Sequence, residues 1–146
     1  MNAPEPETDA SEIRCSVLCI EDEPLDQLLV EAQLAHFPNI VLLKASRGKE
    51  GIQIALTERP DLILLDMHLP DMGGLEVVRA LNTQISEGLY RVILLTGDSF
   101  SIDIVKAMSL GAHEYWLKPL KFETLRNDLP RVVRAARTDR LRSRSR

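Results

Sequence analysis

The segment Leu62-Ile63-Leu64-Leu65-Asp66 decides the fold of this chain, because four consecutive branched apolar residues end on one acid. A run of this kind is typical of a strand buried on both faces of a parallel sheet. Three other apolar runs end in the same way: residues 17–20 on Glu21-Asp22, residues 92–95 on Thr96 and residues 115–117 on Lys118. The carboxyl ends of parallel strands form the crevice where ligands bind, so these polar residues are expected to converge there.

Outward from this segment, apolar strands alternate with amphipathic helical stripes. The strands are predicted at residues 15–20, 40–43, 61–65, 91–95 and 113–117. Helical spacing predicts five helices, which begin behind Pro24 and around Ile52, Leu75, Ile104 and Leu125. Right-handed crossovers then favour an α/β fold with a doubly wound, five-stranded parallel sheet in the order 2-1-3-4-5, covered by helices on both faces as a three-layer sandwich.

Two places need a special backbone. Pro130 lies within the last apolar stripe, where it removes a backbone donor, so the last helix is expected either to kink near Leu129 or to restart with Asp128 as its cap. The pair Gly73-Gly74 is expected to allow a turn with positive φ and a close approach of the chain to the site.

Length and composition favour one domain. A chain of 146 residues with 45% hydrophobic content can bury a full core without disulfides. No apolar run is long enough to span a bilayer, and the N-terminus is acidic where a signal peptide would be basic, so we expect a soluble, cytoplasmic protein without membrane contact. Cys15 and Cys19 lie four apart in one predicted strand, too far for a disulfide, and are expected to be core thiols.

Charge is distributed unevenly along the chain. The formal net charge is −4, yet residues 126–146 hold eight Arg against two Asp. The acidic body argues against nucleic-acid binding by this domain, since duplex affinity depends largely on Lys and Arg. We expect a disordered leader at 1–13, a domain at 14–137 and a solvated basic tail or linker at 138–146, whose removal would change stability little.

Together these motifs resemble the receiver domain of bacterial two-component response regulators, which has a flavodoxin-like fold. The resemblance covers residues 14–136 and depends on four elements in order: the Glu-Asp pair, Asp66 in the segment DMHLPDMGGL, Thr96-Gly97 and Lys118-Pro119. It implies a role for each matched residue: phospho-acceptor Asp66, metal-holding acids Glu21 and Asp22, switch hydroxyl Thr96, invariant lysine Lys118 and switch aromatic Tyr115. The pair is Glu-Asp here, where Asp-Asp is commoner.

The chemistry of the acids agrees with a magnesium site. A carboxylate attacks an anionic phosphoryl group poorly unless positive charge is nearby. Mg²⁺, or Mn²⁺ in its place, prefers oxygen ligands, which suits Asp22 and Asp66 as direct ligands and Glu21 acting through water. The resemblance adds the backbone carbonyl of His68 as a third ligand.

The remaining residues face the phosphoryl group in this prediction. Lys118 offers a compact positive charge to a phosphoryl oxygen, while Thr96 and Gly97 provide a hydroxyl and a backbone N–H that can approach another. The resemblance further implies that Thr96 and Tyr115 couple the site to a partner surface formed by the fourth helix, the fifth strand and the fifth helix.

The expected function is a phosphorylation-activated signalling switch that assists its own phosphorylation and dephosphorylation but is no enzyme acting on a separate substrate. Its expected partners are a sensor histidine kinase or histidine phosphotransfer protein and a downstream protein target, with a homodimer through the partner surface as a further expectation. The main alternative is the N-terminal receiver of a longer regulator. A haloacid-dehalogenase-like phosphatase would need an acid where His68 stands, and a flavin protein would need a phosphate loop where Glu21-Asp22-Glu23 stands.

Overall fold

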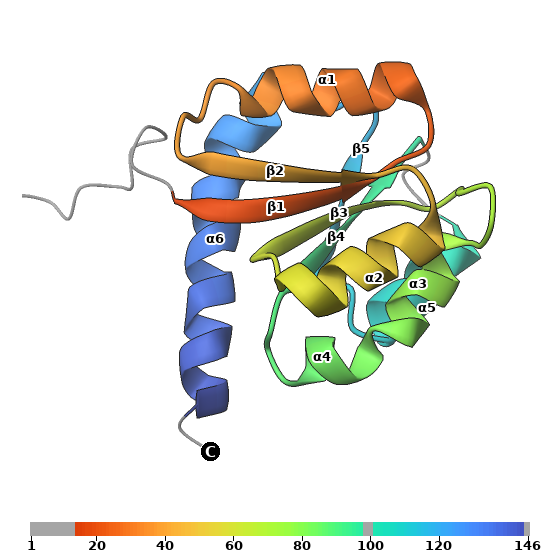
Figure 1. The fold of residues 1–146 in the computed structure, drawn as a ribbon, viewed down its shortest axis with the longest axis vertical. Coiled ribbons are helices and arrows are strands. Elements are labelled where there is room, and N and C mark those ends of the chain that lie inside the picture. Colours follow the sequence, from red (N-terminus) through yellow and green to blue (C-terminus); the bar gives the residue numbers. More distant parts are fainter. Residues whose placement is uncertain (1–13, 98–100, 145–146) are drawn as a thin grey trace, which may run out of the picture.

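The computed structural model describes residues 14–97 and 101–144, and the leader predicted to be disordered, 1–13, lies outside them. Five strands form one parallel sheet: β1 (Cys15–Ile20), β2 (Ile40–Ala45), β3 (Leu62–Asp66), β4 (Arg91–Thr96) and β5 (Glu114–Leu117). Their order is β2-β1-β3-β4-β5, which confirms the predicted doubly wound topology (Figure 1). The segment Leu62–Asp66, which forms β3, therefore lies at the centre of the sheet.

Helices cover both faces of the sheet, as predicted (Figure 1). Their bounds are α1 (Pro24–Leu34), α2 (Gly48–Glu58), α3 (Gly74–Ala80), α4 (Asn82–Ser86), α5 (Ile102–Ser109) and α6 (Phe122–Arg144). The sequence predicted one helix where the structure has α3 followed directly by α4, because Leu81 leaves helical geometry with φ −100° and ψ 9°. The three layers consist of the sheet in the middle, α1 and α6 on one face, and α2, α3 and α5 on the other.

Alternation within the strands builds two apolar cores. Val17 and Cys19 of β1 face the core shared with α1 and α6, whereas Leu18 and Ile20 face the core shared with α2 and α3. All five residues of β3 are buried, as a central strand requires.

Both cysteines are core thiols, as predicted. Cys15 and Cys19 are buried and free of disulfides. Burial above all raises the pKa of each thiol to about 12, with Asp61 adding to the effect at Cys15 and Glu21 at Cys19. Both thiols are therefore protonated at neutral pH.

The structure excludes one of the two alternatives for the last helix and corrects the expected geometry of the Gly73-Gly74 turn. The last helix does not restart at Asp128, because α6 continues through Pro130 to Arg144. Gly73 has φ −77°, so the turn before α3 does not use positive φ. The close approach does occur at Gly74, where a Cβ would lie 2.9 Å from the Cα of Met67.

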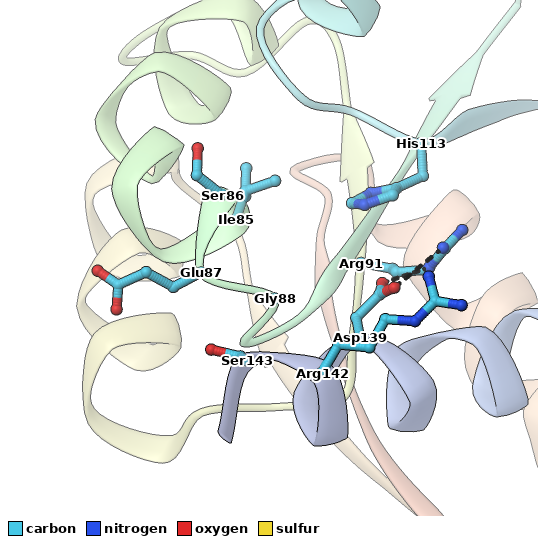
Figure 2. Close-up of a pocket in the computed structure, with 9 residues that line it drawn as sticks. All are labelled: Ile85, Ser86, Glu87, Gly88, Arg91, His113, Asp139, Arg142 and Ser143. Atoms are coloured by element: carbon cyan, nitrogen blue, oxygen red, sulfur yellow. Dashed lines mark hydrogen bonds and ion pairs between the residues drawn. The ribbon is translucent and has the colours of Figure 1, made fainter. Parts of the chain in front are cut away.

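The end of α6 also differs from the expected tail. The boundary expected after residue 137 falls inside the helix, and residues 138–144 form its last turns. There Arg140 lies 2.6 Å from Asp61, just before β3, and Asp139 lies 2.8 Å from Arg91, the first residue of β4. Figure 2 shows the second pair, with the α6 carboxylate turned toward the arginine. The segment thus packs on the amino edge of the sheet.

Among residues 14–97 and 101–144, no helix has both the length and the apolar character needed to cross a membrane.

Candidate functional site

The polar strand ends converge at the carboxyl edge of the sheet. Glu21 and Asp22 follow β1, Asp66 ends β3, Thr96 ends β4 and Lys118 follows β5. The strand register aligns them, because Asp66 pairs with Leu95 beside Thr96, and Thr96 pairs with Leu117 beside Lys118. Residues distant in sequence are thereby brought to one place, as the strand pattern predicted.

The three predicted metal-holding acids form one cluster. A carboxylate oxygen from each of Glu21, Asp22 and Asp66 lies within 4.8 Å of the others. Glu21 and Asp66 are only 1% and 4% exposed. Buried carboxylates this close repel each other unless a cation or protons are added.

Lys118 supplies positive charge to the cluster. Its Nζ lies 2.6 Å from Oε1 of Glu21 and 3.1 Å from Oδ1 of Asp66. Burial opposes the lysine charge, but the hydrogen bond to Glu21 and the field of Asp66 outweigh it and raise the pKa of Lys118. The ammonium is therefore held charged against the acid that was predicted to accept a phosphoryl group.

The single positive charge of Lys118 does not neutralise the three carboxylates of the cluster. Burial above all, with a contribution from the neighbouring Asp66, raises the pKa of Glu21 to about 7, although the hydrogen bond from Lys118 lowers it. A buried carboxyl group beside a second carboxylate carries its negative charge more easily when a cation lies nearby. The donor set is entirely oxygen, which fits a hard divalent cation such as Mg²⁺ or Mn²⁺.

The loop after Asp66 is fastened on both sides. The backbone N–H of Gly74 donates to the carbonyl of Met67 at 2.9 Å. Asp71 accepts from the N–H groups of Gly48 and Lys49 at 2.8 and 2.9 Å, at the start of α2. These hydrogen bonds lower the pKa of Asp71 and hold its carboxylate where the helix N-terminus favours negative charge. The loop leading away from Asp66 is thus tied to α2.

The other predicted residues surround the cluster at different depths. The backbone N–H of His68 donates to Asp66 at 3.3 Å, and its side chain is exposed. Thr96 is 5% exposed, and a Cβ at Gly97 would meet no atom within 4 Å. Tyr115 lies on β5 with 39% of its surface exposed, outside the acid cluster. Its predicted role as a switch residue stays a prediction.

Two residues that contribute to the site were not predicted from the sequence. Asp26, in the first turn of α1, has a carboxylate oxygen 3.3 Å from the Nζ of Lys118. Gln27, the next residue, donates to the carbonyls of Glu21 and Ala45 and so ties the end of β1 to α1. The sequence signal that could have drawn attention to Asp26 is its place in the first turn of the helix that follows the strand-end acids.

The cavity shown in Figure 2 is separate from the acid cluster. It has a volume of about 230 Å³ and is lined by Arg91, His113 and Asp139, among others, at the amino edge of the sheet. Burial, above all, lowers the pKa of His113, whose Nδ1 accepts from the N–H of Val92. The acid cluster lies at the opposite, carboxyl ends of the strands.

A family model described as the response regulator receiver domain matches residues 17–130. The chain therefore belongs to the response regulator receiver domain family.

Particular relatives are similar over most of this chain. The nitrate/nitrite response regulator protein NarL of Escherichia coli (strain K12) is 34% identical over 111 residues, which cover 75% of this chain and 50% of NarL. Protein PilH of Pseudomonas aeruginosa is 30% identical over 117 residues, which cover 80% of this chain and 96% of PilH. The chain thus spans about half the length of NarL and nearly all of PilH.

A solved structure gives the same result. The chemotaxis response regulator CheY4 of Vibrio cholerae superposes with a TM-score of 0.73 at 27% identity, covering 82% of this chain and 99% of that structure. The fold and the family predicted from the strand ends are confirmed.

Proposed function

We propose that this chain is a phosphorylation-activated signalling switch in which Asp66 accepts a phosphoryl group from a histidine kinase or a histidine phosphotransfer protein. The observation that carries the proposal is the 3.1 Å contact between Lys118 and Asp66 inside a cluster of two further acids. A carboxylate held beside an ammonium and a candidate cation site has the surroundings that attack on phosphorus requires.

Asp22 and Asp66 would hold Mg²⁺ directly through carboxylate oxygens and Glu21 would act through water, and the backbone carbonyl of His68 is the further ligand we propose. The bound ion would supply the positive charge that lets an anionic carboxylate approach an anionic phosphoryl group. An oxygen of Asp66 then forms a bond to phosphorus while the bond from phosphorus to the donor breaks, and its electron pair leaves with the donor. Lys118 neutralises a phosphoryl oxygen, and Thr96 and Gly97 donate hydrogen bonds to another.

The proposed function is tested with acetyl phosphate as a small donor. Intact-mass spectrometry of the protein with Mg²⁺ should show the addition of one phosphoryl group, and hydroxylamine should remove it because an acyl phosphate is labile to that nucleophile. EDTA should prevent the addition while the circular dichroism spectrum stays unchanged, since the ion assists the reaction and does not hold the fold. A stable adduct that forms equally well in EDTA would contradict the proposal.

Replacing Asp22 with alanine is expected to weaken Mg²⁺ and Mn²⁺ binding strongly, because it removes one of three oxygen donors from the cluster. The fluorescence of Trp116, which is buried two residues before Lys118, provides the readout for a metal titration. Glu31→Gln is a matched control on α1, since Glu31 is exposed and pairs with Lys44. Equal metal affinity in the wild type and in Asp22→Ala would remove Asp22 from the site.

The partner surface we propose consists of α5, β5 and the start of α6, which correspond to the fourth helix, fifth strand and fifth helix expected from the sequence. Large apolar side chains are exposed on its first two elements: Ile102, Val105, Tyr115 and Leu117. Exposed apolar groups gathered on adjacent elements favour a protein partner, either a downstream target or a second copy of the chain. This surface adjoins the site through Lys118 at the end of β5.

The variant Thr96→Ala is expected to separate chemistry from signalling. It should still accept a phosphoryl group on Asp66, more slowly than the wild type, because the acids and Lys118 are intact. It should lose most of the phosphorylation-induced change in partner affinity, a coupling of about 1 to 3 kcal/mol in typical switches. Pull-down of the partner by fully phosphorylated protein measures this, and wild-type affinity in the variant would refute a coupling between Thr96 and Tyr115.

The alternative architecture is the same receiver at the front of a longer regulator. It is supported by relatives such as NarL, of which this chain matches half, whereas the chain matches 96% of PilH. The proposed chemistry at Asp66 is the same in both cases.

A further inference from the structure

Three carboxylates, not two, surround the ammonium of Lys118. Its Nζ lies 2.6 Å from Glu21, 3.1 Å from Asp66 and 3.3 Å from Asp26. Glu21 and Asp66 belong to the acid cluster that could hold a metal ion, whereas Asp26 does not. Asp26 is therefore the one of these three partners that contacts the lysine without also being a candidate metal ligand.

This difference matters when a divalent cation enters the cluster. The cation attracts the oxygens of Glu21 and Asp66 and repels the Lys118 ammonium, because like charges a few ångströms apart in a partly buried site interact strongly. Asp26 stays available to the ammonium, since its carboxylate is not drawn to the ion. The position of Asp26 in the first turn of α1 also favours its negative charge.

We propose that Asp26 is a positioning residue, which holds the Lys118 ammonium on the α1 side of the site so that the acid cluster can accept a divalent cation and Asp66 a phosphoryl group. The inference rests on the proposed function and adds a residue to it. Asp26 acts through Lys118 and touches neither the cation nor the phosphoryl group. Its side chain is 37% exposed, so the charge can be removed without opening the core.

The experiment compares Mn²⁺ binding by three variants with that of the wild-type protein, using electron paramagnetic resonance to count the free ion. Asp26→Asn should bind Mn²⁺ about threefold to fivefold more weakly, the effect of losing one partly exposed ion pair. Asp26→Glu should restore binding to within about twofold, since the longer acid still reaches the lysine. Glu31→Gln removes the same charge from the same helix without touching Lys118 and should bind as the wild type does.

A second readout is the initial rate of phosphorylation by acetyl phosphate at saturating Mg²⁺, which should fall in Asp26→Asn and recover in Asp26→Glu. Melting temperatures show whether each variant is folded, and Asp26→Ala takes the place of Asp26→Asn in the comparison if the asparagine variant is unstable. Equal Mn²⁺ affinity in wild type, Asp26→Asn and Glu31→Gln would overturn the inference but leave the proposed function intact. A wild-type protein that binds no Mn²⁺ would overturn both.

Discussion

Replacing Arg140 with alanine is expected to lower the free energy of unfolding by about 2 kcal/mol and the melting temperature by roughly 8 °C. The Arg140 guanidinium lies 2.6 Å from Asp61 and donates to the carbonyls of Leu89, Arg59 and Pro60 at 2.7, 3.0 and 3.0 Å. The side chains of Arg140 and Asp61 are 29% and 17% exposed, so removing the arginine leaves a largely buried acid without this partner.

Thermal melts followed by circular dichroism measure the effect. Arg142→Ala is a matched control, because Arg142 lies on the same helix two residues later and is exposed. Deleting residues 138–146 should destabilise the protein further, since it also removes the Asp139 partner of Arg91. An unchanged melting temperature in Arg140→Ala and in the deletion would mean that the end of α6 contributes nothing to stability.

This prediction reverses the expectation drawn from the sequence, in which the segment 138–146 was a solvated tail. Its abundance of arginine suggested a polar linker, and no local pattern indicates that an arginine will meet carbonyls and a carboxylate from two other parts of the chain. Such contacts depend on where α6 ends relative to the amino edge of the sheet. We propose that the domain extends to Arg144 instead of ending at residue 137.

The sheet could be predicted well because its strands carry a strong local signal. Near-continuous branched apolar runs such as 62–65 have few alternatives to a buried parallel strand, and the crossover rule then limits their order. The effect of Pro130 on the last helix was harder to predict, because the energetic cost of a proline inside a helix depends on packing. In the structure Leu129, Val132 and Val133 are buried against the sheet, and this burial keeps α6 continuous.

The candidate site was predictable for a related reason. Residues at strand ends inherit their positions from the topology, so Glu21, Asp66 and Lys118 could be brought together before any side chain was placed. Asp26 lies on a helix, and its contact with Lys118 depends on how α1 packs over β1. The sequence pattern does not predict how α1 packs over β1.

Asp66→Asn is expected to abolish phosphorylation completely, because an amide oxygen is not a nucleophile toward phosphorus. The asparagine is nearly the same size as the acid, so Glu21, Asp22 and Lys118 should stay in place. The melting temperature should not fall, since the substitution removes one of three mutually repelling carboxylates.

The central claim is tested most directly by the intact mass of wild-type and Asp66→Asn protein after incubation with acetyl phosphate and Mg²⁺. Peptide mapping after borohydride reduction of the acyl phosphate locates the modified residue. We predict one phosphoryl group on the wild-type chain, located at Asp66, and none on the variant. Equal labelling of the two proteins, or a label mapped to a different residue in the wild type, would contradict the account.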